Sequence, residues 1–310
     1  MNDFEEKFKN LESDLVNEQR RMPLNSCLKV YYGITSEKQY RISFISSIRP
    51  YEFESTKELK ITQGKESDEV YWTCFDLMDD EAKDVFFIFC ASLIDTIDGK
   101  TDEISALDSL KARYSSWRLL LKSKGRIPYE IYQGLYGELF FLHEYLMKNN
   151  NIDVAINSWV GPEGYSKDFS INDTWYEIKT IGTSSSEVKI NSLAQLDSDV
   201  DGHLVVISVE KMSKEFDTGL CSVSKLYRDI IDNITDHQLR EKFINKVLKY
   251  GFVDDDNSIN NNKFEVKKVN FYHVVDKFPK LTRKNVTSMI ITNVSYNLAI
   301  GSLEEYKEDF

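Results

Sequence analysis

The sequence predicts an α/β (α+β) protein in which a central mixed β-sheet is flanked by helices, with an N-terminal β-rich addition and a C-terminal α+β addition. Strand-like runs dominate the first part of the chain, a helix and then several strands occupy the middle, and helices followed by strands return at the end. The 310 residues suffice for two modest domains or for one catalytic core with additions. The expected regions are an N-terminal α+β region at 1–99, a core at 100–212 and a C-terminal helical and β region at 213–310.

The N-terminal region begins with a predicted antiparallel sheet. Its strands are expected at 30–35, at 40–48 and in a hairpin at 59–78 with its turn in QGKESD. Acidic residues followed by apolar residues at helical spacing predict a helix at 79–97. Gly99 separates it from a second helix, for which Thr101 is the candidate N-cap and which runs to residue 124.

The middle of the chain has the order of a compact α/β unit with a mixed sheet. A helix is predicted at 129–150. The strands that follow are expected at 168–171, 174–181, 186–192 and 203–212, with a short LAQL segment before the last. Beyond them the pattern predicts one or two helices at 224–251, a loop at 254–262, and strands at 264–275 and 288–300.

The cysteine pattern and the apolar runs indicate a cytoplasmic protein. The four cysteines are scattered without a CxxC pair, so neither a zinc site nor a disulfide framework is indicated. The start of the sequence lacks an apolar signal core, and the longest apolar run, at 85–94, is too short to span a bilayer. We therefore expect free thiols, no secretion and no membrane insertion.

The formal net charge of -12 argues against nucleic-acid binding, but one segment is locally basic. Between residues 111 and 126 there are six basic residues and no acidic one: Lys111, Arg113, Arg118, Lys122, Lys124 and Arg126. This stripe is either a solvated helix face or a set of phosphate contacts to DNA.

The strand 174–181 and its neighbour 168–171 carry the main candidate site. Side chains alternate along a strand, so Glu177 and Lys179 project to the same face, and Asp168 on the neighbouring strand can lie near Glu177. Two adjacent carboxylates repel unless a cation intervenes, and Mg²⁺ typically takes one or two carboxylates. Such an ion, with Mn²⁺ as a substitute, can stabilise negative charge on a phosphodiester while a lysine orients the nucleophile. The alternative is a surface hairpin with a cross-strand ion pair.

The helix at 129–150 supplies a third carboxylate. At 100° per residue, Glu138 falls on the face that should pack on the sheet, where an unpaired carboxylate is costly. Gly134 and Gly137 flank it, which is understandable if the helix backbone comes close to another element. Glu138 therefore either points at the Asp168/Glu177 site or reaches solvent from the edge of the apolar stripe.

Other chemistries find little support. The four histidines have no metal-ligand spacing, and HExxH, GxSxG and the phosphate-binding loop GxxxxGK[ST] are all missing from the sequence. Any ATP-driven step would therefore need a partner protein.

Four segments together resemble the PD-(D/E)XK nuclease superfamily, and in particular the bacterial restriction-endonuclease-like family of "PD-(D/E)XK motif" proteins. They are GLYGELFFL (134–142), WVGPEGYSKDFSI (159–171), YEIKT (176–180) and VKINSLAQL (188–196). The resemblance implies that Asp168 and Glu177 are metal ligands, that Lys179 is the catalytic lysine and that Glu138 assists metal binding. It also implies a supporting role for Gln195. The residue before Asp168 is Lys167, which departs from the proline of the family motif.

The leading functional hypothesis is a Mg²⁺-dependent DNA endonuclease of a bacterial restriction or phage-defence system. A homodimer is expected because one site cuts one strand, and the resemblance implies an ATPase or methyltransferase partner. The alternative is a catalytically silent nuclease-fold subunit that binds DNA or partner proteins in a defence complex. A third possibility, an α/β protein of unrelated function with a decorated hairpin, predicts that Glu138 lies far from Asp168.

Overall fold

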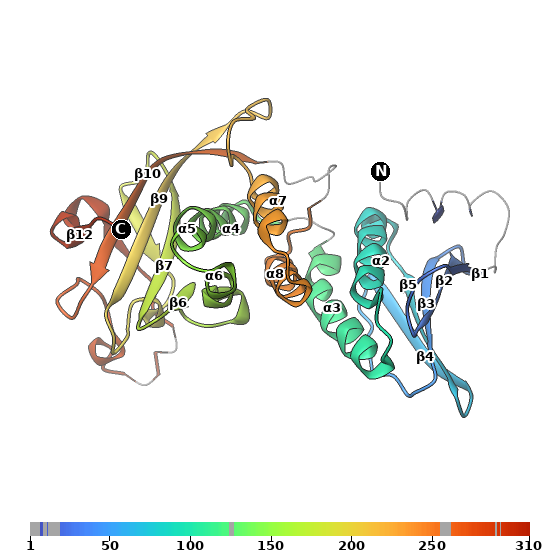
Figure 1. Cartoon of the computed structure of the whole chain (residues 1–310). Helices are drawn as coiled ribbons and strands as arrows, with labels where there is room; N and C mark the ends of the chain where they lie inside the picture. The colour runs from blue at the N-terminus through green and yellow to red at the C-terminus, as the bar shows by residue number, and fades with distance from the viewer. Residues whose placement is uncertain are drawn as a thin grey trace. The chain divides into compact units, whose positions relative to one another are not determined.

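The computed structural model describes residues 7, 8, 11, 19–123, 127–254, 262–288, 290, 291 and 293–310. The chain forms two compact units, 1–126 and 127–310, each with its own helices and sheet (Figure 1). The α+β class is confirmed. The predicted boundaries after residues 99 and 212 fall inside these units rather than between them.

The structure bears on the predicted state of the cysteines and on the predicted lack of a membrane-spanning helix. All four cysteines are free thiols, as expected; three are buried and Cys27 is half-buried. No helix in the described part of the chain combines the length and the apolar character needed to cross a bilayer.

The N-terminal unit is built on an antiparallel five-stranded sheet with the order β1-β2-β3-β5-β4. Its strands are β1 (Gln19–Met22), β2 (Lys29–Ile34), β3 (Tyr40–Ser46), β4 (Leu59–Ser67) and β5 (Val70–Leu77). The predicted sheet is confirmed, but the hairpin turn lies after Ser67 instead of within 63–68. Gly64 does not form the turn, because it pairs with Trp72 inside the ladder, and β4 continues beyond it through a register shift.

Two helices pack against this sheet, α2 (Lys83–Ile97) and α3 (Glu103–Ser123), with a 3₁₀ turn, η1 (Asp80–Ala82), before α2. Phe75 of β5 contacts Phe89 of α2 and Tyr114 of α3, with ring centres 5.8 and 5.7 Å apart. The carboxylate of Asp102 accepts a hydrogen bond of 2.7 Å from a backbone N–H in the first turn of α3. The predicted cap at Thr101 is therefore wrong by one residue, since Asp102 has the side chain that reaches this N–H.

The C-terminal unit is built on a mixed five-stranded sheet with the order β12-β10-β9-β7-β6. Its strands are β6 (Phe169–Ile171), β7 (Thr174–Gly182), β9 (Gly202–Met212), β10 (Lys263–Val274) and β12 (Lys307–Glu308). Strands β7 and β9 run parallel and the other pairs are antiparallel. A small second sheet pairs β8 (Glu187–Ile190) with β11 (Tyr296–Ala299), so the strand predicted at 288–300 is much shorter than expected.

Helices cover one face of the mixed sheet. They are α4 (Tyr129–Phe141), which continues through a π-helical turn (Leu142–Leu146) into α5 (Met147–Asn149), then α6 (Ile152–Ser158), α7 (Val223–Asn233) and α8 (His237–Lys249). The short 3₁₀ turns are η3 (Gly161–Glu163), η4 (Leu193–Gln195), η5 (Arg283–Asn285), η6 (Ile300–Ser302) and η7 (Glu304–Tyr306). The predicted region 224–251 therefore contains two helices. Most of the loop predicted at 254–262 lies outside the described residues.

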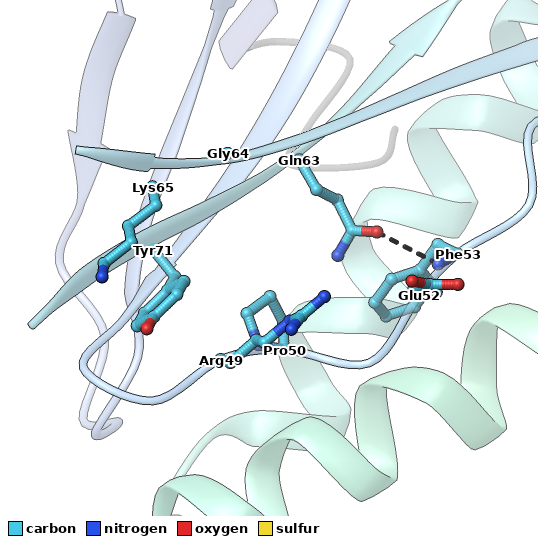
Figure 2. Close-up of a pocket in the computed structure, with 8 residues that line it drawn as sticks. All are labelled: Arg49, Pro50, Glu52, Phe53, Gln63, Gly64, Lys65 and Tyr71. Atoms are coloured by element: carbon cyan, nitrogen blue, oxygen red, sulfur yellow. Dashed lines mark hydrogen bonds between the residues drawn. The ribbon is translucent and has the colours of Figure 1, made fainter. Parts of the chain in front are cut away.

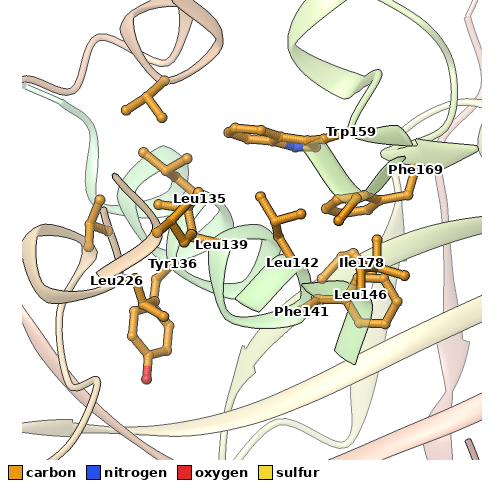
Figure 3. Packing of buried hydrophobic residues seen from close by; sticks show 14 of the residues in the cluster. Leu135, Tyr136, Leu139, Phe141, Leu142, Leu146, Trp159, Phe169, Ile178 and Leu226 are labelled. Atoms are coloured by element: carbon orange, nitrogen blue, oxygen red, sulfur yellow. The ribbon is translucent and has the colours of Figure 1, made fainter. Parts of the chain in front are cut away.

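One hydrophobic core joins the middle of the chain to its last third. Leu139 of α4, Ile178 of β7 and Leu226 of α7 belong to the same buried cluster (Figure 3). Trp175 of β7 belongs to a second cluster with Leu204 of β9. The side chains of β7 thus alternate between two cores, and Glu177 and Lys179 lie on the side opposite α4.

The close approach of α4 to β7 depends on a glycine. A Cβ on Gly137 would lie 1.8 Å from Oγ1 of Thr180, whereas a Cβ on Gly134 would meet nothing within 4 Å. Gly137→Ala is therefore expected to lower the free energy of unfolding by about 1–3 kcal/mol. Gly134→Ala, the matched control, should leave stability unchanged or raise it by up to about 1 kcal/mol because alanine favours helix. Urea unfolding measures both, and equal effects would contradict the proposed close packing.

Candidate active site

The β6–β7 hairpin fixes Asp168 beside the backbone of β7. Asp168 directly precedes β6, and its Oδ2 accepts a hydrogen bond of 2.7 Å from the backbone N–H of Ile178. Its carbonyl oxygen accepts hydrogen bonds of 2.8 and 2.9 Å from the N–H groups of Val160 and Gly161. Asn172, with a φ of 50°, forms the tight turn between the strands. The Asp168 carboxylate is thus held at the edge of the sheet, next to Glu177.

Glu177 and Lys179 are neighbours on β7, as strand alternation predicts. The Glu177 side chain is 1% exposed, and Nζ of Lys179 lies 2.8 Å from its Oε1. Neither oxygen of Glu177 accepts a well-formed hydrogen bond, so this contact is an ion pair without good hydrogen-bond geometry. Burial, together with the nearby charge of Asp168, raises the pKa of Glu177 to about 8. A desolvated carboxylate without hydrogen bonds is an expensive group that a cation would stabilise.

Glu138 is buried on α4, with 7% of its surface exposed. Its Oε2 accepts hydrogen bonds of 2.7 Å from Nε1 of Trp159 and 2.6 Å from the hydroxyl of Tyr250. Burial and then the charge of Asp168 raise its pKa well above the ordinary value, although both hydrogen bonds act in the opposite direction. Glu138 therefore does not reach out to solvent.

Glu138 and Asp168 meet at Gly161. A Cβ on Gly161 would lie 3.1 Å from Oδ1 of Asp168 and 3.5 Å from Oε2 of Glu138, so the two carboxylates flank one point in space. Burial raises the pKa of Asp168 as well. The interpretation as an unrelated decorated hairpin, which predicted that these residues lie far apart, is contradicted.

Asp168 and Glu177 fit a hard divalent cation as a pair of ligands. In the described part of the chain, no group of three or more His, Cys, Asp or Glu side chains is arranged to hold a metal ion. Asp168 and Glu177 nevertheless have the chemistry that Mg²⁺ or Mn²⁺ requires: two desolvated, mutually repelling oxygen donors, one of them without hydrogen bonds. Oε2 of Glu138 accepts hydrogen bonds from Trp159 and Tyr250, which leaves its other carboxylate oxygen for a cation, and its assistance in metal binding stays a prediction.

Gln195, predicted as a supporting residue, contacts Lys179. Its Oε1 accepts hydrogen bonds from Nζ of Lys179, at 3.2 Å, and from the N–H of Asn191, at 2.7 Å. Lys167 holds the segment that carries it, because its Nζ donates to the carbonyl oxygens of Ala194, Gln195 and Asp197. Lys167, which replaces the proline of the family motif, thus stabilises the turn that carries Gln195.

Sequence reasoning missed Tyr250 and the role of Trp159. Tyr250 follows α8, 112 residues away from Glu138, and no local spacing connects them. Trp159 lies within a segment that resembles the nuclease family, but a tryptophan before an edge strand usually indicates packing alone. Its indole stacks on Tyr250, with ring centres 5.8 Å apart, so the two donors to Glu138 also support each other.

The three residues of the predicted basic stripe whose side chains the structure describes all contact other residues of the N-terminal unit. Arg113 is 2% exposed and donates to Thr96 of α2, so its prediction as a DNA contact is wrong: it lies on the buried face of α3. Lys111 donates to the carbonyl oxygen of Glu52, and Arg118 pairs with Glu54 at 3.1 Å. The side chain of Lys122, and Lys124 and Arg126 altogether, lie outside the described residues.

The mixed sheet carries an aspartate at its edge strand and Glu-x-Lys on the adjacent strand, and the covering helix adds a glutamate. This arrangement defines a PD-(D/E)XK-type, restriction-endonuclease-like core. The chain belongs to the family described as "Putative PD-(D/E)XK family member, (DUF4420)", whose sequence model matches residues 4–301. That match extends over both compact units. Comparisons with curated proteins and with solved structures gave no match.

Proposed function

We propose that the C-terminal unit is a divalent-metal-dependent endonuclease site that hydrolyses phosphodiester bonds of DNA in a bacterial restriction or phage-defence system. The observation that carries this proposal is the desolvated pair Asp168 and Glu177, without compensating hydrogen bonds on Glu177 and with Lys179 beside it. Such a pair weakens the folded state unless a bound cation compensates the two buried charges. Family membership supports the same reaction class.

Asp168 and Glu177 would hold Mg²⁺ or Mn²⁺, and Glu138 would add a third negative charge beside them. The bound cation would supply Lewis-acid chemistry, neutralising charge on the phosphodiester and making a water more acidic. Trp159 and Tyr250 fix the Glu138 carboxylate by hydrogen bonds, so Glu138 would act through a negative charge in a fixed position. Gly161 leaves the space between the two acids open.

Lys179 would act on the substrate. Its ammonium group is held by Gln195 and lies beside Glu177, where it can stabilise the negative charge that develops on the phosphorus oxygens. In the hydrolysis, water loses a proton and its oxygen forms the new bond to phosphorus. The ester P–O bond breaks, and the leaving alkoxide takes up a proton. One such site cuts one strand, which is why a homodimer belongs to the proposal. The resemblance to the family adds an ATPase or methyltransferase partner to the proposal.

The alternative is a silent nuclease-fold subunit that binds DNA or partner proteins. One observation favours it: Lys179 already satisfies part of the charge of Glu177 by an ion pair of 2.8 Å. A protein of this kind would have no need for added metal.

Plasmid cleavage by the full chain tests the proposal. The wild type, Asp168→Ala and the matched control Asp173→Ala, an exposed aspartate in the same hairpin, are compared with Mg²⁺, Mn²⁺ or EDTA on methylated and unmethylated DNA. Metal-dependent nicking or linearisation by the wild type and the control, lost in Asp168→Ala, is the expected result. Intact DNA throughout, together with no Mn²⁺ binding in calorimetry, would favour the silent subunit.

A further inference from the structure

The N-terminal unit contains an open pocket of about 640 Å³ that is lined only by residues of that unit. The segment after β3 forms one wall through Arg49, Glu52 and Phe53, while Lys65 of β4 and Tyr71 of β5 lie across from it (Figure 2). This volume is typical of a site for a small organic group. Neither the motifs nor the family match assigns it a role.

The wall of this pocket is firmly built. Nε2 of Gln63 donates to the carbonyl oxygen of Tyr51 at 2.8 Å, and its Oε1 accepts from the N–H of Phe53 at 3.1 Å. From α3, Lys111 donates to the carbonyl oxygen of Glu52, and its ammonium lies 4.8 Å from the ring centre of Phe53. Helix and sheet thus hold the segment from both sides, so the pocket is preformed.

The lining combines opposite charges with aromatic rings. Arg49 is exposed and has no hydrogen-bond or ion-pair partner among the described residues. Lys65 is 47% exposed, and its ion pair with a carboxylate of the hairpin turn is weakened by solvent. Figure 2 shows Lys65 and Tyr71 at one end, Glu52 and Phe53 at the other, and Arg49 between them.

This mixture of groups restricts the chemistry of the ligand. A simple anion such as phosphate would be attracted by Arg49 but repelled by Glu52. An apolar ligand would cover the charge of Arg49 without replacing its water. The ligand should therefore carry an anionic group, a planar ring and hydrogen-bond donors within one compact unit.

We propose that this pocket binds one unpaired nucleotide of a single-stranded DNA segment. The phosphate matches Arg49 and Lys65, and the base can stack on Tyr71, which is only half-buried. The N–H groups of the base can donate to the carboxylate of Glu52. A base that is stacked inside a duplex cannot enter such a pocket, so the site selects unpaired strands. This binding role goes beyond the proposed cleavage and does not depend on it.

Photocrosslinking in EDTA tests the site in the full chain. A ten-nucleotide single strand with 5-iodouracil is irradiated with the protein, and the crosslinked peptide is identified by mass spectrometry. Arg49→Glu is compared with Lys29→Glu, an exposed lysine of β2 that does not line the pocket and gives the same change of charge. We expect a crosslink at Tyr71, and roughly tenfold weaker binding in fluorescence anisotropy for Arg49→Glu alone.

Competition identifies the ligand class. An excess of thymidine monophosphate should displace the strand, whereas inorganic phosphate at the same concentration and ionic strength should not. Crosslinks confined to residues 127–310, equal binding by the two variants, or equal competition by phosphate would each overturn the proposal. Because cleavage is blocked in EDTA, a protein that binds here but never cuts DNA would refute the proposed endonuclease and leave this site standing.

Discussion

Glu177→Gln is expected to lower DNA cleavage by roughly 10³-fold while making the metal-free protein more stable than the wild type at pH 8. The loss of activity follows because an amide is a neutral and weaker ligand for a hard divalent cation than a carboxylate. The gain in stability follows because Glu177 is 1% exposed and neither of its oxygens accepts a well-formed hydrogen bond. We expect this gain to be about 1–3 kcal/mol at pH 8, the cost of a buried polar group without a hydrogen bond, because Lys179 keeps Gln195 as a partner when the carboxylate is removed.

The sign of the predicted change in the free energy of unfolding follows from the pKa of Glu177. In the unfolded chain Glu177 ionises near its ordinary pKa of 4.5, whereas in the folded protein its pKa is about 8. Between these values the folded protein retains a proton that the unfolded chain has lost, so the free energy of unfolding falls as pH rises. The contribution of this group is fully present below pH 4.5 and is lost as pH rises through about 8. Glutamine does not ionise, so the variant should lack this slope, which is at most about 1.4 kcal/mol per pH unit.

Urea unfolding in EDTA over this pH range measures the effect. Glu210→Gln, an exposed carboxylate on the neighbouring strand β9, is the matched control and should change stability little. Adding Mn²⁺ should stabilise the wild type and the control by mass action, but not Glu177→Gln. A Glu177→Gln protein less stable than the wild type at pH 8 in EDTA would show that the carboxylate is well accommodated and would remove this reason for a metal site.

The candidate site was predictable where it depends on local periodicity. Alternation along a strand places Glu177 and Lys179 on one face, and helical spacing places Glu138 on the buried face of α4. The glycine at 137 indicated a close backbone approach, which Thr180 accounts for. These inferences need only the repeat of one element and the chemistry of one side chain.

The parts that sequence reasoning could not reach depend on contacts between distant segments. Tyr250 and Glu138 meet only because α8 packs in the same core as α4, and that core also explains why a boundary after residue 212 has no counterpart in the fold. Arg113 shows the opposite failure. It was predicted as a DNA contact from the positive charge of its segment, but its position on α3 directs its side chain toward Thr96 in the interior of the unit.

Lys167→Met is expected to lower kcat by about 10- to 100-fold with little change in KM or in Mn²⁺ affinity. Nζ of Lys167 donates to the carbonyl oxygens of Ala194, Gln195 and Asp197 at 2.7, 2.8 and 3.2 Å, which uses the three donors of an ammonium group. The same ammonium lies 3.9 Å from the ring centre of Trp175. Methionine keeps most of the apolar stem but removes the ammonium group, and with it every donor and the contact of this charge with the Trp175 ring.

The effect passes through the turn η4 to Lys179, the proposed catalytic lysine. Without Lys167 the carbonyl oxygens of this turn lose their partner, the Gln195 side chain is held only by the N–H of Asn191, and its 3.2 Å contact with Nζ of Lys179 weakens. Lys167→Arg, which restores donors, should recover part of kcat, whereas the control Lys189→Met on the exposed side of β8 should not alter it. In a double-mutant cycle, Lys167→Met and Gln195→Leu should be strongly non-additive, because both act on Lys179 through one chain of contacts. Additive losses, or an effect on KM alone, would mean that Lys167 stabilises the fold without positioning the lysine.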